Sequence, residues 1–341
     1  MKLWQAALLL ICIACVAGAA EAKPRSHAKM AGAKPSIEGY WRINFILPME
    51  APPGVSQLIV SEEEAKTVAA IAGKALSDEF AATLDPELPM QVTQSDGLAI
   101  VRGQRRTRAV VLPADGKLPY TAAARRELAA PPPSSTGAAD NPEQRPNAER
   151  CLVGAGQPPL SSFSLDSQIQ ILRTHDQVVI HVEYGDDVRI VPLTRTHGPR
   201  VLWSRLGDSI GHWEGQTLVI ETIGMPDPDR FRLAPTLIVP GDATVIERLT
   251  PISQRELLYQ FTVIDPKVYS APWLGEFSWF RTDKRMYESA CHEGNYSLPN
   301  ILAGARHEEA VAKAQASPLS SAPGTAKPNA LSGAQKLPGS E

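Results

Sequence analysis

The chain has 341 residues, 43% of them hydrophobic, and a formal net charge of -3 at pH 7. A chain of this length buries a sizeable hydrophobic core. Its weak negative charge argues against a nucleic-acid-binding protein, which would carry a basic face. The basic cluster from Arg102 to Arg108 lies between apolar runs and is interpreted as a solvated loop. We therefore expect a folded domain that has no nucleic-acid partner.

The first 22 residues have the pattern of a secretion signal. Lys2 supplies a basic start, and the apolar run from Leu3 to Val16 is too short to span a bilayer as a helix. Ala20-Glu21-Ala22 places small residues where signal peptidase requires them, so cleavage is predicted after Ala22. No second run of spanning length follows. The mature protein is therefore expected to be soluble and periplasmic or secreted.

A lipid anchor is the alternative to free release. Cys12-Ile13-Ala14-Cys15 resembles a lipobox, in which Cys15 becomes the lipid-bearing first residue, although Cys12 stands where leucine is usual. The sequence leaves both forms open.

Only Cys151 and Cys291 remain once the signal is removed. In an oxidising compartment two such cysteines pair more often than they stay free, so a disulfide is predicted. It would close a loop of about 140 residues and stabilise the fold by roughly 4 to 5 kcal/mol. Two buried free thiols are the alternative, because cysteine is also a common core residue.

The mature chain is predicted to begin with an arm, a strand and a helix. Lys23 to Ser36 is polar and small, which is typical of a flexible arm. Ile37 to Phe45 alternates in its apolar positions and predicts a strand. Ser61 and Glu64 form a capping box at the start of an apolar stretch, which predicts a helix that runs to Leu76.

From Gly97 onward, short runs rich in β-branched and aromatic residues are separated by Gly, Pro and Asp, the pattern of antiparallel strands. Leu98–Val101 and Arg108–Leu112 are predicted to form a hairpin. Ala129 to Asn147 contains three consecutive prolines and predicts a long surface loop. Later strands are predicted at Gln168–Arg173, Gln177–Tyr184, Asp187–Leu193, Gln216–Thr222, Thr244–Thr250, Glu256–Ile264, Glu276–Arg281 and Arg285–Cys291.

The fold class follows from the absence of helices between these strands. A parallel sheet needs crossover helices, and none is predicted from Gln168 to Cys291. Eight or more antiparallel strands hide their edges in a closed barrel or a two-sheet sandwich. Leu298 to Ala316 predicts a C-terminal helix, and Ser317 to Glu341 a disordered tail. We therefore predict one mainly β domain over residues 37–316, with one N-terminal and one C-terminal helix.

Four segments carry a resemblance to a known family, and they are Glu149-Arg150-Cys151-Leu152, Leu206 to Thr222 (LGDSIGHWEGQTLVIET), Tyr287 to Tyr296 (YESACHEGNY) and Asn300 to Arg306 (NILAGAR). They resemble an abundant family of exported bacterial proteins with no assigned function. The resemblance covers roughly residues 37–306 and implies a shared β-rich fold, but no reaction and no catalytic residue. The opening Gly39-Tyr40-Trp41 also resembles the GxW start of lipocalins.

Gly207-Asp208-Ser209-Ile210-Gly211 matches the GxSxG pattern of a serine nucleophile. A nucleophile elbow needs a helix directly after the serine, and the predicted strand from Gln216 follows instead. The segment is therefore interpreted as a turn between two strands. A Ser209 nucleophile with His292 as its base is the alternative.

Four glutamates stand inside or at the end of apolar strands, and they are Glu183, Glu221, Glu247 and Glu288. Glu247 shares a strand face with Val245 and Leu249, and Glu221 shares one with Val219. If those faces form the core, the carboxylates point inward and must be paired, hydrogen-bonded or protonated. The candidate partners are Arg189, Arg248, Arg281, His181 and His292. Solvated glutamates on half-exposed strands are the alternative.

A metal site is the less favoured interpretation of the histidines. His181 and Glu183 lie two residues apart on a predicted strand and share a face, and His292-Glu293 would add two ligands. A compact ligand motif such as HExxH is absent from the sequence. We therefore predict neither a metal nor an organic cofactor.

Two hypotheses about function remain. The preferred one is an exported barrel-like protein of unassigned function that binds a small apolar ligand in its interior, because no catalytic motif stands in its required context. Its candidate ligand-binding residues are Arg189, Trp213, Glu247, Tyr259 and Tyr287. The alternative is a lyase, isomerase or hydrolase without a cofactor. Its candidate acid–base residues are His181, Glu183, Glu221 and His292. The ligand and the oligomeric state stay open.

Overall fold

The structure is a computed structural model that describes residues 35–81, 95–129, 139–145, 150–152, 155–160, 167–225 and 241–316. Internal contacts divide the chain into Met1–Pro35 and Ser36–Glu341, and the fold described below is that of the second unit. The predicted signal peptide, most of the predicted arm, part of the predicted loop at 129–147 and the predicted tail lie outside the described residues.

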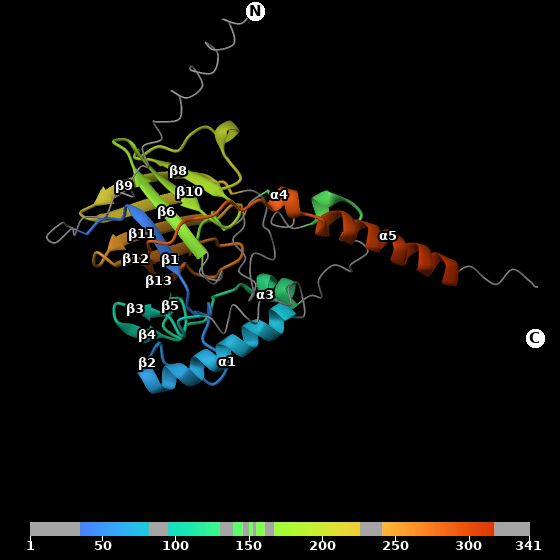
Figure 1. The fold of residues 1–341 in the computed structure, drawn as a ribbon, viewed down its shortest axis with the longest axis horizontal. Coiled ribbons are helices and arrows are strands. Elements are labelled where there is room, and N and C mark those ends of the chain that lie inside the picture. The colour runs from blue at the N-terminus through green and yellow to red at the C-terminus, as the bar shows by residue number, and fades with distance from the viewer. Residues whose placement is uncertain are drawn as a thin grey trace, which may run out of the picture. The chain divides into compact units, whose positions relative to one another are not determined.

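The described residues form mainly β structure (Figure 1). The strands are β1 (Gly39–Ile43), β2 (Ile59–Val60), β3 (Ile100–Val101), β4 (Gln104–Arg106), β5 (Val110–Leu112), β6 (Ser167–Arg173), β7 (Gln177–Val182), β8 (Asp187–Pro192), β9 (Asp208–Glu214), β10 (Thr217–Ile223), β11 (Thr244–Pro251), β12 (Glu256–Ile264) and β13 (Trp273–Arg281). The helices are α1 (Glu62–Ala81), α3 (Ala122–Ala129), α4 (Cys291–Gly294) and α5 (Ser297–Ala316), with short 3-10 turns η2 (Pro142–Gln144) and η3 (Arg200–Leu202).

The large sheet is antiparallel and curls into a nearly closed barrel. Its strand order is β8-β7-β6-β1-β13-β12-β11-β10-β9, and β5 pairs with β13 beside this path. The end strands β8 and β9 lie side by side (Figure 1). Gly211 of β9 faces Val191 of β8 so closely that a Cβ at Gly211 would lie 2.8 Å from Val191 Cγ1. Side-chain packing, rather than a ladder of hydrogen bonds, therefore brings the two edges together.

The barrel interior follows from period-two alternation. In β11, Val245, Glu247 and Leu249 are buried while the residues between them are more exposed. Aromatic rings pack in the interior. The ring centroids of Tyr259 and Phe277 are 5.0 Å apart, and those of Phe277 and Trp279 are 5.7 Å apart. These contacts make this part of the interior a packed core.

A second, small sheet lies against the outer face of β13. Its strand order is β2-β4-β3, and helix α1 packs on it through Ala65 and Val68, which contact Val60 and Leu98. Helix α1 begins at the predicted capping box, because the Ser61 backbone N–H donates to Glu64 Oε2 at 2.9 Å while Ser61 Oγ accepts from the Glu64 N–H at 3.3 Å.

The structure confirms the predicted fold class, with a barrel-like rather than a sandwich arrangement. The helices predicted after Ser61 and at Leu298–Ala316 are present, as α1 and α5. Helix α3 was not predicted. Within the described residues, none of the helices combines the length and the apolar character needed to cross a bilayer.

Three local predictions were wrong. The runs at residues 98–101 and 108–112 form no hairpin with each other, since β3 pairs with β4 and β5 pairs with β13. The predicted turn at Gly207–Gly211 is mostly strand β9, and Gly207 alone precedes it. Residues 285–290 form no strand, and Cys291 begins helix α4. For the first two, the strand that each segment pairs with is set by tertiary contacts that a local sequence pattern does not reveal.

Candidate functional site

Glu247 is a carboxylate that is fully buried in the barrel interior. Both oxygens of Glu247 face the guanidinium of Arg189, with Nη1–Oε2 at 2.8 Å and Nη2–Oε1 at 2.9 Å. The Tyr259 hydroxyl also donates to Glu247 Oε1 at 2.7 Å, and it accepts from the Leu160 backbone N–H at 2.7 Å. Three of the five predicted ligand-binding residues therefore meet in one network.

This network is satisfied by the protein's own groups. Burial, followed by the neighbouring Glu247 charge, raises the pKa of Tyr259 well above its usual range, so its hydroxyl stays a donor. The bidentate arginine neutralises the Glu247 carboxylate, which is fully shielded from solvent. The inward glutamate thus has the paired form that the sequence predicted. Its contacts fit a structural ion pair and leave no carboxylate oxygen without a partner.

The other three glutamates do not point into the core. Glu221 and Glu288 are exposed. Glu183 is half-buried outside the barrel, where it accepts from the Tyr287 backbone N–H at 2.7 Å. In β10 the core-facing residues are Leu218 and Ile220, and the continuous apolar run there hid which face was inward.

The four predicted acid–base residues make separate contacts in the described part of the chain. His181 Nε2 lies 2.6 Å from Asp186 Oδ1, and Glu183 bonds Gln168 and the Tyr287 amide. Glu221 bonds His197, and His292 is exposed on α4. No hydrogen bond or ion pair joins any two of the four.

Two further predicted ligand-binding residues lie apart from the Glu247 network. Trp213 is partly buried at the end of β9, with the Arg173 guanidinium 4.4 Å from its ring centroid. This is the geometry of a cation–π contact. Tyr287 is 76% exposed. The site prediction stays a prediction for both residues.

Sequence reasoning missed a histidine held between two carboxylates. His197 Nδ1 lies 2.7 Å from Asp208 Oδ2, and its Nε2 lies 3.0 Å from Glu221 Oε1. The cluster ties the chain that follows β8 to β9 and β10, where the barrel edges meet. Both ring nitrogens lie within hydrogen-bond distance of a carboxylate oxygen, so neither is open to a substrate in this arrangement. His197 stands beside Gly198-Pro199 without any periodic pattern, and no local signal marks it.

Ser209 has the environment of a structural serine. It is buried in β9, and its Oγ lies 2.8 Å from Thr222 Oγ1 on β10. A nucleophile elbow would place the hydroxyl on an exposed turn before a helix. The strand context therefore favours the structural interpretation.

The basic cluster at residues 102–108 is not a solvated loop, which corrects the sequence interpretation. Arg106 is buried and forms a 3.0 Å ion pair with Glu276 on the outer face of β13. Arg108 is buried and donates to the carbonyls of Ser56, Val110 and Ala114. Glu276 and the Ser56 carbonyl come from segments remote in the sequence, so nothing local indicates that these two arginines are buried.

A pocket of about 260 Å³ opens between the small sheet and the outer faces of β1 and β13. It has room for about nine water molecules or a small organic molecule. Apolar side chains and three arginines line it together with one carboxylate. The lining residues are Arg42, Asn44, Phe45, Asp96, Leu98, Ile100, Arg105, Phe280, Arg281 and Thr282.

Hydrogen bonds hold the side chains of two of these arginines, Arg281 and Arg105, in place. Arg281 stacks on Trp41, with 4.4 Å from its guanidinium carbon to the ring centroid, and it donates to the carbonyls of Gln254, Ser36 and Glu38. In the described residues no carboxylate lies within ion-pair distance of Arg281. Burial lowers the pKa of Arg281 from its usual value.

Arg105 is held from the side that faces helix α1. Its Nε lies 3.0 Å from Glu62 Oε1, and its Nη1 donates to the Leu98 carbonyl at 2.7 Å. Its Nη2 forms no hydrogen bond with the described residues. Arg105 therefore presents an oriented guanidinium group at the pocket, a geometry suited to a carboxylate or phosphate. The Arg281 side chain instead lies on the same face of the sheet as Trp41, its partner in the β1–β13 register.

The pocket could not have been found in the sequence, because its lining comes from three separate segments. No group of three or more His, Cys, Asp or Glu side chains suited to a metal ion occurs among the described residues.

The chain matches no known family model in a comparison of its sequence with such models. A comparison with curated proteins finds no match either.

Proposed function

We propose that this protein is an exported, non-catalytic binding protein that holds a small organic anion in the pocket between the barrel and the small sheet. Arg105 is the observation that carries the proposal. Its side chain is only 20% exposed at the pocket wall, its guanidinium is fixed by Glu62 and the Leu98 carbonyl, and its Nη2 forms no hydrogen bond with the described residues. A bound anion would give that Nη2 group a partner and offset part of the cost of holding the charge away from water.

The pocket walls support a ligand with an apolar part. Phe45, Leu98, Ile100 and Phe280 line the same space as the arginines. A few placed polar groups among apolar side chains are typical of small-molecule sites. The volume suits a molecule on the order of ten non-hydrogen atoms. Small aromatic or branched aliphatic carboxylates combine these features.

Export is supported by the sequence pattern of residues 1–22 and by the Cys151–Cys291 disulfide. Disulfides persist in oxidising compartments such as the periplasm. The ligand site differs in place from the one first predicted, since it lies outside the barrel rather than in its aromatic interior.

Calorimetric titration with matched probes tests the proposal. Phenylacetate carries the charge and the ring, and phenylacetamide has nearly the same shape without the charge. We expect phenylacetate to bind with a dissociation constant in the millimolar range or tighter, and the amide to bind at least tenfold more weakly. Equal binding of the two probes would overturn the anion assignment.

Variants locate the site. Thr282→Trp should fill the pocket and abolish binding, and Arg105→Gln should weaken it. Arg248→Gln is the matched control, because Arg248 forms an exposed pair with Glu214 and does not line the pocket. Binding that survives Thr282→Trp unchanged would show that the anion binds elsewhere.

A further inference from the structure

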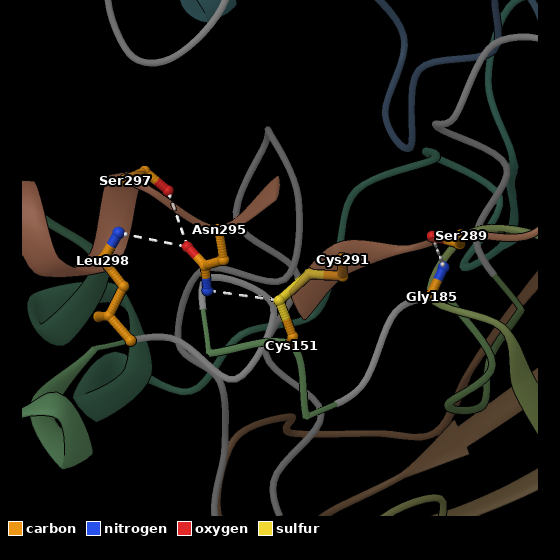
Figure 2. Close-up of a disulfide and its surroundings, with 7 residues drawn as sticks. All are labelled: Cys151, Gly185, Ser289, Cys291, Asn295, Ser297 and Leu298. Atoms are coloured by element: carbon orange, nitrogen blue, oxygen red, sulfur yellow. Dashed lines mark hydrogen bonds between the residues drawn. A yellow bond between two sulfur atoms is a disulfide. The ribbon is translucent and has the colours of Figure 1, made fainter. Parts of the chain in front are cut away.

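The disulfide joins Cys151 and Cys291, which lie 140 residues apart in the sequence. It fastens to the barrel the C-terminal segment, which contains α4 and α5. The Cα atoms of Cys151 and Cys291 are 5.7 Å apart. Before Cys291, the Tyr287 N–H donates to Glu183 Oε1 at 2.7 Å. Figure 2 shows the next contact, in which Ser289 Oγ accepts from the Gly185 N–H at 3.0 Å. The predicted disulfide is thereby confirmed, and it completes a set of contacts at the end of β7.

The two sulfur atoms have different surroundings. Cys291 is exposed at the start of α4, where an external reagent can reach it. Cys151 is partly buried, and its Sγ accepts a hydrogen bond from Asn295 Nδ2 at 3.3 Å (Figure 2). A donor at a sulfur atom stabilises the thiolate form of that sulfur.

The orientation of the Asn295 amide is set by its other contacts. Its Oδ1 accepts from the Leu298 N–H at 3.2 Å and from Ser297 Oγ at 3.1 Å (Figure 2). Both partners are donors, so the oxygen must face them. The NH₂ group is therefore the end that faces Cys151.

The backbone of Cys151 adds a second asymmetry. Its φ is +56°, in the left-handed region that residues other than glycine and asparagine rarely adopt. Release of Cys151 from the disulfide removes one of the constraints that hold this conformation.

We propose that the Cys151–Cys291 disulfide is a directional site of thiol–disulfide exchange. An incoming thiolate attacks Sγ of Cys291, a new S–S bond forms there, and the Cys151–Cys291 bond breaks with its electron pair going to Cys151. Asn295 stabilises the departing Cys151 thiolate, which then takes a proton from solvent. A second external thiolate attacks the external sulfur of the mixed disulfide, so two external thiols are oxidised to a disulfide as both cysteines are reduced.

Exchange changes how the C-terminal segment is held. With the S–S bond open, this segment is joined to the end of β6 and β7 by hydrogen bonds, including those from the Tyr287 and Gly185 amides. A partner that presents a reactive thiolate could then control how firmly α4 and α5 are attached.

Trapping with reduced glutathione tests the direction of attack. The oxidised full-length mature protein is incubated with glutathione, quenched with iodoacetamide, and digested for peptide mass spectrometry. We expect glutathione on Cys291 and alkylation on Cys151, in at least tenfold excess over the reverse pattern. Equal labelling, or glutathione mainly on Cys151, would overturn the proposal.

Rates with dithiothreitol test the role of Asn295. Asn295→Ala should slow opening of the disulfide about three- to tenfold, because the leaving thiolate loses its donor. Asn300→Ala is the matched control, an amide deletion at an exposed position of α5, and should leave the rate unchanged. Circular dichroism checks that both oxidised variants fold. If Asn295→Ala does not fold, Ser297→Ala takes its place, because it loosens the same amide, and it should slow exchange by a smaller factor. An unchanged rate in whichever of the two variants folds would contradict the role of Asn295.

Discussion

Arg189 in β8 and Glu247 in β11 form a two-point ion pair although five strands separate β8 from β11 in the sheet order. In a flat sheet the two strands would lie about 29 Å apart at 4.8 Å per step. The contact exists because the sheet curls until its inward side chains meet. The closure of the barrel is therefore seen at two places. Inside the barrel it forms the Arg189–Glu247 ion pair, and at the seam, where the end strands β8 and β9 meet, it packs Gly211 on Val191.

Removal of one partner of this pair should strongly destabilise the protein. Glu247→Gln leaves the Arg189 guanidinium buried without a counter-charge, so we expect the free energy of unfolding in urea to fall by about 3 to 5 kcal/mol. Glu214→Gln breaks the exposed pair with Arg248 and should lower the free energy of unfolding far less than Glu247→Gln does, because solvent screens that pair. Similar losses in the two variants would mean that the interior pair is not desolvated.

Alkaline pH should destabilise the fold through Tyr120, which stacks on Tyr269 with ring centroids 5.0 Å apart. Burial raises the pKa of Tyr120 to about 12. The unfolded chain loses this proton near pH 10, so the stability present below pH 10 falls as pH rises toward 12, by at most about 2 to 3 kcal/mol. Unfolding in urea at pH 9, 10 and 11 measures the decline. Tyr120→Phe should make it shallower, whereas Tyr184→Phe, at a 55% exposed position, should not.

Two glycines with the same backbone conformation should respond differently to alanine. Gly224 has φ +66° and Gly215 has φ +63°. A Cβ at Gly224 would collide with the Trp203 ring, whereas a Cβ at Gly215 would meet nothing within 4 Å. Gly215→Ala should cost about 1 to 2 kcal/mol for its left-handed backbone, and Gly224→Ala about 1 to 3 kcal/mol more. Thermal unfolding of both variants gives the difference, and equal costs would show that Trp203 moves away freely.

His197 should stabilise the seam of the barrel. His197→Ala removes two hydrogen bonds to carboxylates and leaves Asp208 at the seam, so we expect a loss of about 1 to 3 kcal/mol in the free energy of unfolding. His212→Ala is the control, because its contact with Glu214 is longer, at 3.3 Å, and exposed. Its loss should stay below about 0.5 kcal/mol. Chemical denaturation compares the two, and a larger effect at His212 would contradict the assignment.

Much of the fold was predictable because strands and caps are local features. Alternation over Thr244–Thr250 and Glu256–Ile264 placed β11 and β12 almost residue for residue, and Ser61 with Glu64 marked the start of α1. The same reasoning failed at Asp208–Glu214, where two glycines suggested a turn. Gly211 is instead a strand residue, since the neighbouring strand leaves no room for a side chain.

The candidate site was less predictable than the fold. Glu247 and Arg189 were both singled out, because a charge on an apolar strand face demands a partner. The pocket, the His197 cluster and the burial of Arg106 and Arg108 were not foreseen. Each depends on segments that are remote in sequence and carry no periodic signal of their own.

The sequence by itself determined the β-rich class and the helix cap, and it predicted the pairing of Cys151 with Cys291 and the need for a partner at Glu247. These properties depend on neighbours along the chain or on the composition of one segment. The tertiary structure alone decided that the sheet closes, that the small sheet covers β13, and that residues of β1, β4 and β13 meet at one pocket. The physical reason is that side-chain alternation gives a strand its two faces, whereas the partner for each face is chosen by packing among elements far apart in the sequence.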